Sequence, residues 1–216
     1  MAISKPVFAK EKTTVTPAGV AGFPWLTKAD FQFDEGGKYK TNLIFNADDP
    51  GLAALKKKIA PIHKAAKTAV LATGTKEGKI TMVSPFKPET DESGNDTGRI
   101  MISAHTTATQ KVGDKNVNVN LTIVDSRKKA LAESTPVYGG SVLKLAVRPA
   151  PYFMQGNLGI TFYLSAVQVI ELASGGDAAS LFDEEEGGFE NEETPADSFD
   201  STDADVDPGA DDADFY

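Results

Sequence analysis

In three short stretches of the chain, basic side chains share a predicted strand face with polar or apolar residues. These stretches cover residues 38–45, 99–105 and 141–148, where every second residue points to the same side of a strand. Neighbouring strands with such faces would form a groove that follows a phosphate backbone. An ordinary solvated sheet face fits the charge pattern equally well. The basic candidates for the groove are Lys38, Lys40, Arg99, Lys144 and Arg148.

Aromatic residues close to these charges would add surfaces on which flat groups such as nucleobases can stack. In RPAPYFM (148–154), Tyr152 and Phe153 follow Arg148, and two prolines predict a stiff turn that keeps the rings accessible at a strand end. A stacked base gains roughly 1–3 kcal/mol whatever its identity. Either ring could instead plug the end of a barrel. Further candidate platforms, each of which also suits a core position, are Trp25, Phe31, Phe33 and Phe86.

Motifs for catalysis and metal binding fail on inspection. GTKEGK (74–79) has three residues between its glycines where a phosphate-binding loop has four, and Ile80 replaces the required Ser or Thr. The chain holds two histidines, His63 and His105, and no cysteine, so a histidine-rich or thiolate metal site is out of reach. His105 is interpreted as a polar residue on a strand face. The sequence therefore predicts no catalytic residue, no metal and no cofactor.

Formal charge divides sharply along the chain. The net charge is -9, yet the segment from Ala173 onward carries 16 Asp and Glu and no Lys or Arg, which leaves residues 1–172 with a net charge of +7. Such asymmetry indicates a polyanion partner. Low hydrophobicity and high charge predict that residues 173–216 form a disordered acidic tail. Lys111, in a predicted loop, would help to steer a polyanion toward the groove.

The sequence also bears on the compartment. Without cysteine the chain forms no disulfide, and it shows neither a signal-peptide core nor 18 consecutive apolar residues. We therefore expect a cytoplasmic protein that makes no membrane contact.

Alternating apolar and polar residues predict a mainly β domain over residues 1–172. The clearest strand is NVNVNLTIV, Asn116–Val124. A helix is predicted to begin at Asp49 and Pro50, and Pro61 should kink or split it. Five or more short strands with one internal helix favour a small β-barrel, of which the five-stranded OB-fold is a partly open example, although a sandwich fits the periodicity too. Other strands are predicted at residues 38–45, 99–105, 141–148 and 160–172, weaker ones at 5–15, 25–33 and 79–84, and a loop at 85–98.

Several blocks of the sequence resemble the single-stranded DNA-binding protein of T-seven-type podophages. NLTIVDSRKK (120–129), PVYGGSVLKLAVRPAPY (136–152) and VQVIEL (167–172) match that family in order and spacing. GGKYKTNLIF (36–45), followed by DDP and a helix, also fits, as does an acidic tail with an aromatic end. The resemblance implies an OB-fold that coats single strands during phage DNA replication, recombination and repair in the cytoplasm of an infected bacterial host.

The resemblance also implies roles for individual residues and partners. Carried over by position, Tyr39 with Lys40, Lys144 and Tyr152 would contact DNA, and Tyr152 resembles the base-stacking tyrosine of the family. The family further implies strand annealing, and contacts of the tail with the phage DNA polymerase and primase-helicase.

Two departures from the family pattern concern the charges on the groove. The strand RIMISAH (99–105) has Arg99 as its one firm charge where the family is basic. After Tyr152 the family continues with a basic residue and then Trp, whereas this chain has Phe153 and Met154. DNA affinity is therefore expected to depend more on stacking and on the lysines of the helix.

These patterns favour a non-enzymatic, sequence-independent single-stranded DNA-binding protein. The alternative of another class is a protein-interaction or chaperone-like module whose acidic arm holds basic clients. A metal-dependent nuclease would require clustered acids, and the close acidic sets of residues 1–172 fall on predicted turns and loops. Whether the protein forms a homodimer stays open.

The tail, which closes in DADVDPGADDADFY (203–216), resembles single-stranded DNA, with carboxylates in place of phosphates and rings in place of bases. Such a tail would occupy the groove when DNA is absent. Once displaced, it would be free for a partner to bind, with an aromatic residue as the apolar anchor. A purely solvating tail is the alternative. The predicted partner-binding residues are Asp211, Asp212, Asp214, Phe215 and Tyr216.

Overall fold

The computed structural model describes residues 5–32, 34–91, 93–112, 115–132 and 134–174. The chain divides into two units, residues 1–176 and 177–216, and the second unit lies outside the described residues. The predicted disorder of the acidic tail therefore stays a prediction.

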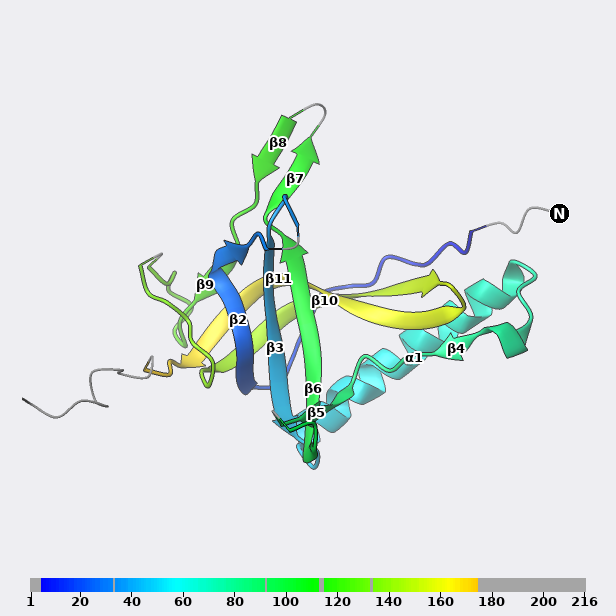
Figure 1. Ribbon diagram of the computed structural model, residues 1–216, viewed down its shortest axis with the longest axis horizontal. Coiled ribbons are helices and arrows are strands. Elements are labelled where there is room, and N and C mark those ends of the chain that lie inside the picture. Colours follow the sequence, from blue (N-terminus) through cyan, green and yellow to red (C-terminus); the bar gives the residue numbers. More distant parts are fainter. Residues whose placement is uncertain (1–4, 33, 92, 113–114, 133, 175–216) are drawn as a thin grey trace, which may run out of the picture. The chain divides into compact units, whose positions relative to one another are not determined.

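Five strands pair with one another in a ring (Figure 1). Strand β2 (Gly19–Asp30) pairs antiparallel with β3 (Lys38–Asn46), and β3 pairs antiparallel with β6 (Asp96–Thr107). Strand β6 runs parallel to β11 (Asn157–Glu171), which pairs antiparallel with β10 (Val142–Met154). Two residues at the start of β10 then pair with β2 and close the ring. The expectation of a mainly β domain is confirmed.

One side of each ring strand faces a shared apolar core. On β10, Leu143, Leu145 and Val147 are fully buried, while the residues between them are partly exposed. They pack with Ile102 of β6 and Phe162 of β11. Burying one such side chain contributes roughly 1.5–3 kcal/mol. A slip by one residue would turn the whole set toward water, so the core fixes the register of the ring.

Helix α1 (Pro50–Ala72) begins where the sequence predicts. The Asp49 carboxylate accepts hydrogen bonds from the backbone N–H groups of Gly51 (2.6 Å) and Leu52 (3.1 Å), and Pro50 occupies a first-turn position where no N–H is needed. The predicted split at Pro61 does not occur, because buried residues anchor the helix on both sides of this exposed proline. The anchoring residues are Leu52, Leu55 and Ile59 before it, and Ala66 and Val70 after it.

Short strands extend the ring. They are β1 (Thr14–Val15), which pairs with β10; β4 (Thr81–Met82) and β9 (Thr122–Val124), which pair with β11; and β5 (Lys87–Thr90), which pairs with β6. A 3-10 turn, η1 (Glu77–Lys79), follows α1. Strands β7 (Thr109–Val112) and β8 (Lys115–Asn118) form a separate two-stranded sheet, the hairpin at the top of Figure 1.

The prediction of one continuous strand over Asn116–Val124 is wrong. Strand β8 ends at Asn118 and β9 begins at Thr122. The first half pairs with β7 and the second half pairs with β11, so the two halves belong to different sheets, separated by three residues outside any strand. Alternation of apolar and polar residues is the same on both sides of such a break, because it reports only the local strand period.

The turn predicted in RPAPYFM is also wrong, since β10 continues through both prolines to Met154. The turn comes at Gln155 and Gly156, which have positive φ values of 51° and 82°. Proline is tolerated on a strand edge that lacks a partner. Within the described residues, β10 pairs beyond Val147 with β11 alone, so one edge is free there. The predicted loop at residues 85–98 contains β5 and the start of β6.

In the described part of the chain, α1 lacks an apolar stretch long enough to cross a membrane.

Candidate functional site

A transverse row of five side chains crosses the outer face of the ring, one from each strand. Trp25 on β2 pairs with Lys40 on β3, and Lys40 pairs with His105 on β6. His105 pairs with Tyr163 on β11, and Tyr163 pairs with Arg148 on β10. Three of these four pairs are antiparallel, and directly opposite side chains in such pairs have Cβ atoms about 4.5–5.5 Å apart. In the fourth, parallel pair, the rings of His105 and Tyr163 are in contact. The transverse row therefore runs without interruption from β2 to β10.

Tyr163 is held from two sides within the transverse row. Its ring centroid lies 5.6 Å from that of His105, in an edge-to-face arrangement. The guanidinium of Arg148 lies 5.0 Å from the same ring centroid, within the range of a cation–π contact. Because 38% of Tyr163 remains exposed, the ring is positioned by the protein and still open to a ligand.

Two ion pairs hold the lysines of β3 in place. The Lys40 ammonium donates to buried Asp30 at 2.5 Å, and the Lys38 ammonium contacts Asp34 at 2.9 Å. The hydrogen bond from Lys40, with a second one from the backbone N–H of Gln32, lowers the pKa of the Asp30 carboxyl. An ammonium group has three donors, so each lysine can keep its carboxylate and still bind an anion.

A hollow of about 480 Å³ lies beside the transverse row, over strands β3 and β6. Its floor includes Asn42 and Ser103, which are opposite one another in the β3–β6 pairing. The Ser103 hydroxyl donates to Asn42 Oδ1 at 2.7 Å. The complete lining of this β3–β6 hollow is Phe23, Lys38, Lys40, Thr41, Asn42, Ser103, Ala104 and His105.

A second hollow of about 200 Å³, the β6–β11 hollow, shares Ser103 and His105 with the first. Tyr152 and Lys87 line it. Tyr152 lies across Gly159, its partner on β11, so closely that a Cβ atom on Gly159 would approach the tyrosine oxygen to 2.5 Å. We call the two hollows with the transverse row the groove. Glycine at position 159 leaves the space that Tyr152 occupies.

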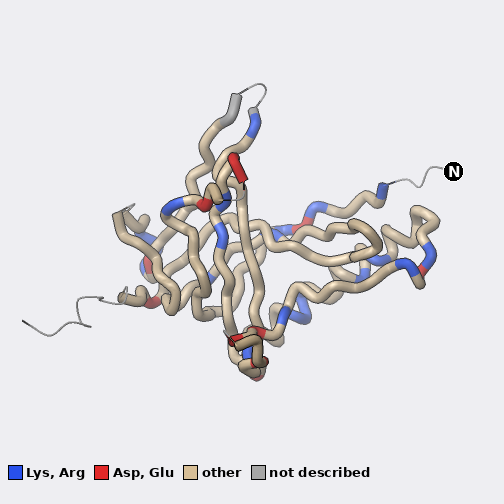
Figure 2. Tube along the Cα trace, viewed as in Figure 1, with Lys and Arg blue, Asp and Glu red and all other residues tan. Residues whose placement is uncertain are grey.

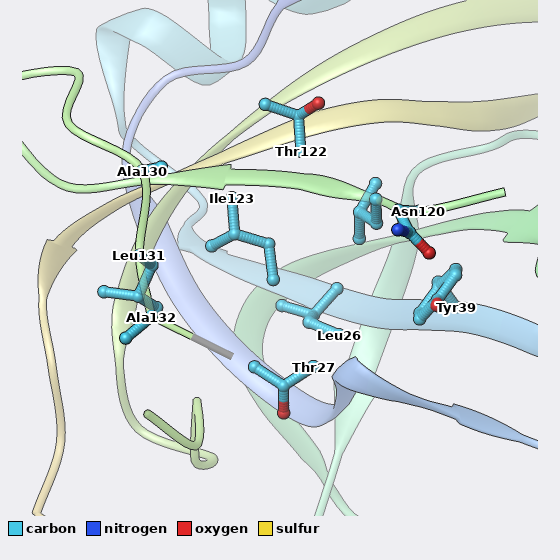
Figure 3. Close-up of a pocket in the computed structure, with 10 residues that line it drawn as sticks. Leu26, Thr27, Tyr39, Asn120, Thr122, Ile123, Ala130, Leu131 and Ala132 are labelled. Carbon is cyan, nitrogen blue, oxygen red and sulfur yellow. The ribbon is translucent and has the colours of Figure 1, made fainter. Parts of the chain in front are cut away.

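A third hollow, of about 430 Å³, lies elsewhere (Figure 3). Figure 3 shows Tyr39 at one end beside Asn120, and Leu131 and Ala132 at the other. All of its described lining residues are uncharged, so it does not suit a polyanion. The family resemblance implies that Tyr39 contacts DNA together with Lys40, but the two side chains line different hollows because successive residues of β3 point to opposite faces.

The structure brings five of the predicted binding residues together at the groove. They are Trp25, Lys38, Lys40, Arg148 and Tyr152. Lys144 shares a β10 face with Arg148 but pairs with Gln168, away from both hollows. Lys111 is exposed on β7, outside the ring.

Two predicted binding residues are engaged by the protein itself. Arg99 forms a fork with the Glu89 carboxylate, with distances of 2.5 and 2.9 Å. Phe153 packs against an apolar cluster that includes Val70 of α1 and Leu158 of β11, because it points to the opposite side of β10 from Tyr152. We therefore leave Arg99 and Phe153 out of the candidate site. The predicted partner-binding residues, Asp211 to Tyr216, lie outside the described residues.

Sequence reasoning missed His105, Tyr163 and Phe23 as site residues. On β11, Ile160, Phe162 and Leu164 are buried, so Tyr163 stands on the alternate, outward face. A tyrosine on an outward strand face, where the flanking residues of the same face are polar, is a signal that the sequence contains. For Phe23 no such signal exists, since its neighbours in the groove come from other strands. His105 lies on a strand face that was predicted to contribute to the groove, but its contact with Tyr163 comes from another strand.

Other basic residues lie along α1 and in the segment after it, outside the groove (Figure 2). One of them, Lys67, is paired with Glu77 at 2.5 Å. Among the described residues, acidic and histidine side chains form no group able to hold a metal ion.

The geometry thus combines flat rings, cations and small polar groups on one continuous face. Rings stack on planar groups such as nucleobases, and ammonium or guanidinium groups bind phosphate. Residues 18–172 match the family model of the single-stranded DNA-binding protein of bacteriophage T7. The chain belongs to this family.

Two curated relatives agree with the assignment. The single-stranded DNA-binding protein of Enterobacteria phage T3 is 26% identical over 200 residues, covering 83% of this chain and 86% of the relative. The protein of Escherichia phage T7 is 26% identical over 206 residues, covering 87% and 86%. The predicted resemblance is confirmed.

Two solved structures share the fold. The crystal structure of gp2.5, the single-stranded DNA-binding protein of bacteriophage T7, matches with a TM-score of 0.65 at 23% identity, covering 84% of this chain and 100% of that one. The protein of bacteriophage Enc34 in complex with single-stranded DNA matches with a TM-score of 0.53 at 16% identity, covering 79% and 97%.

The imidazole of His105 gives a test of the groove's electrostatics. Burial, and to a smaller extent the positive charge of Lys38, lowers its pKa below the usual 6.5. Lys38→Met should raise this pKa, although burial keeps it below 6.5, as NMR titration can measure. Lys144→Met is the control and should leave it unchanged. An unchanged pKa in Lys38→Met would mean that Lys38 does not act on the ring.

The lowered pKa of His105 also affects the stability of the folded protein. Between the folded pKa of His105 and 6.5, the unfolded chain binds more protons than the folded one. The contribution of His105 to the free energy of unfolding therefore rises with pH across that window.

Proposed function

We propose that this protein binds single-stranded DNA without sequence preference, and that the groove is its binding surface. The observation that carries the proposal is the transverse row, in which three rings and two cations from five neighbouring strands lie in register. The rings of Trp25 and Tyr163 would stack on bases, and the charges of Lys40 and Arg148 would bind the phosphates between them.

Stacking explains why such a groove would prefer single strands. In a duplex each base has its two faces covered by neighbouring base pairs, so a protein ring cannot reach them without unstacking the helix. In a single strand the faces are free, and every base offers one. The affinity should therefore depend little on the identity of the bases and strongly on whether the DNA is single-stranded or duplex.

We further propose that the ring of strands is an OB-fold, a partly open five-stranded barrel. The closed pairing order β2, β3, β6, β11, β10 supports this, as does the very short contact of two residues between β10 and β2. Oligonucleotides bind OB-folds on the face of the second and third strands. In this ring those strands are β3 and β6, which carry the larger hollow of the groove.

In the cell we propose a non-enzymatic role in phage DNA replication, recombination and repair, in the cytoplasm of an infected bacterium. The support is membership of the family, together with relatives from phages T3 and T7 that carry the same description. The acidic tail would compete with DNA for the groove and recruit the phage polymerase and primase-helicase. Its 16 acidic residues against a net charge of +7 in the rest of the chain support the competition.

Binding should weaken as salt increases, because each phosphate contact releases condensed counterions. With Lys38, Lys40 and Arg148 as three contacts, a plot of log K against log salt should have a slope of about −2. Fluorescence anisotropy with a labelled oligodeoxythymidine measures it. A matched duplex should bind more weakly. An affinity independent of salt, or higher for the duplex, would contradict the proposal.

Adjacent aromatic residues on β10 should separate binding from folding. Tyr152→Ala removes a ring from the groove and should weaken binding by roughly 1–3 kcal/mol, with little change in stability. Phe153→Ala removes a ring from the apolar cluster around Val70 and should lower the free energy of unfolding by about 3 kcal/mol while binding persists. Anisotropy and urea denaturation measure both. Normal binding by Tyr152→Ala would place the site elsewhere.

Removal of residues 175–216 should tighten DNA binding. It takes away the 16 negative charges of a tethered competitor and keeps the hydrogen bond from Ala173 N to Ser141 Oγ. The gain should be largest at low salt, where attraction between tail and groove is least screened. Removal of Phe215 and Tyr216 alone is the matched control: competition should persist, while pull-down of the polymerase and primase-helicase should be lost. Equal recovery by both full-length and two-residue-truncated proteins would mean that the aromatic end plays no part.

A further inference from the structure

Phe23 on β2 has an unusual backbone and an unusual environment. Its φ is +48°, in the left-handed region that bulky residues seldom adopt. Its side chain is 83% exposed, the highest exposure of any aromatic residue in the described part of the chain. Strain and exposure of a large apolar ring both disfavour folding, so the protein core gives no reason for this arrangement.

The register of β2 against β3 shows how the arrangement arises. Gly22 pairs with Asn42, and Trp25 pairs with Lys40, so two residues of β2 are opposite Thr41 alone. This is a β-bulge, a feature that bends a strand and redirects a side chain. At this bulge the redirected side chain is Phe23, which becomes a wall of the β3–β6 hollow.

The floor of the β3–β6 hollow offers a hydrogen-bond donor. Asn42 Oδ1 accepts from the Ser103 hydroxyl, and among the described residues the Nδ2 group of the same amide donates to no protein atom. Lys38 and Lys40 border the hollow and supply positive charge. Its volume of about 480 Å³ leaves room for a planar ring and its sugar. A flat platform, an amide donor and two cations together suit a nucleotide.

We propose that the β3–β6 hollow is a nucleobase subsite, with Phe23 as its stacking platform and the Asn42 amide as donor to the edge of the base. Every base has a hydrogen-bond acceptor on its edge, so this donor is compatible with binding that ignores sequence. The proposal rests on the proposed function and adds a subsite to it. It would extend the DNA path from the β6–β11 hollow, which Tyr152 lines, to β2 at the other end of the groove, on the same side of the transverse row.

The test compares the full-length protein with Phe23→Ala, using a labelled oligodeoxythymidine. Phe23→Ala should bind about 5- to 100-fold more weakly, the loss expected for one stacking platform. Tyr138→Ala is the matched control, because Tyr138 is an exposed aromatic residue that lines neither hollow of the groove. It should bind as the wild type does. Equal affinities of Phe23→Ala and wild type would overturn the subsite, whereas absence of binding by the wild type would overturn the proposed function.

Abasic oligonucleotides identify the ligand group. A series of oligonucleotides would each lack one base, at a different position along the strand. For at least one position, the missing base should weaken DNA binding by the wild type but not weaken binding by Phe23→Ala any further. If the loss of affinity from the missing base and the loss from Phe23→Ala add up at every position, no base contacts Phe23 and the subsite is overturned.

Phe23→Gly distinguishes a binding role from a structural one. Glycine accepts the left-handed backbone without strain, so the variant should resist urea at least as well as the wild type and still bind DNA weakly. Reduced stability would show that the ring supports the fold. Sedimentation velocity covers the remaining alternative: if Phe23→Ala dissociates an oligomer while DNA affinity is unchanged, the ring is a protein contact and the proposal fails.

Discussion

Two residue pairs between β6 and β11 join the core of this protein to its candidate site. Ala104 pairs with Phe162, and His105 pairs with Tyr163. Adjacent residues of a strand point to opposite faces, so the first pair fills the core and the second lies on the surface. Ala104 and Phe162 are both buried, and the small side chain of Ala104 leaves room for the ring of Phe162, so the two strands can pack closely. Core packing thus sets the contact between imidazole and phenol outside.

The same register arranges the cations before any ligand arrives. Lys40 is bound by Asp30, Lys38 by Asp34, and Arg148 by the ring of Tyr163. Ordering a long side chain on binding costs roughly 0.5–1.5 kcal/mol, and groups that are already ordered avoid most of this cost. The acidic partners of the lysines therefore do more than offset charge, since they hold the ammonium groups at the edge of the groove.

The balance between stacking and charge has a physical consequence. Coulombic attraction at an exposed surface is screened over about 8 Å at physiological ionic strength, whereas stacking of rings is not screened by salt. Arg99, one of the few charges on β6, is neutralised by Glu89, and the outer face of β2 presents Phe23 and Trp25. In the proposed complex, a groove of this composition would bind DNA through ring contacts to a greater extent than the net charge of residues 1–172 indicates.

Local patterns in the sequence determined several parts of this protein by themselves. The face shared by Lys38 and Lys40, the face shared by Lys144 and Arg148, and the capped start of α1 at Asp49 all follow from periods of two or from adjacent residues. The charge asymmetry between residues 1–172 and the tail needs no fold at all. Family blocks gave the identity of the chain for the same reason, because they are read along the sequence.

Tertiary structure decided which of these faces meet. Period-two alternation does not say which strand lies next to which, so it could neither place Tyr163 beside His105 nor break Asn116–Val124 between two sheets. It also assumes a regular strand, and the bulge that turns Phe23 outward arises only when β2 pairs with β3. Register between distant strands is set by how their side chains fill a common core, and that depends on all of them at once.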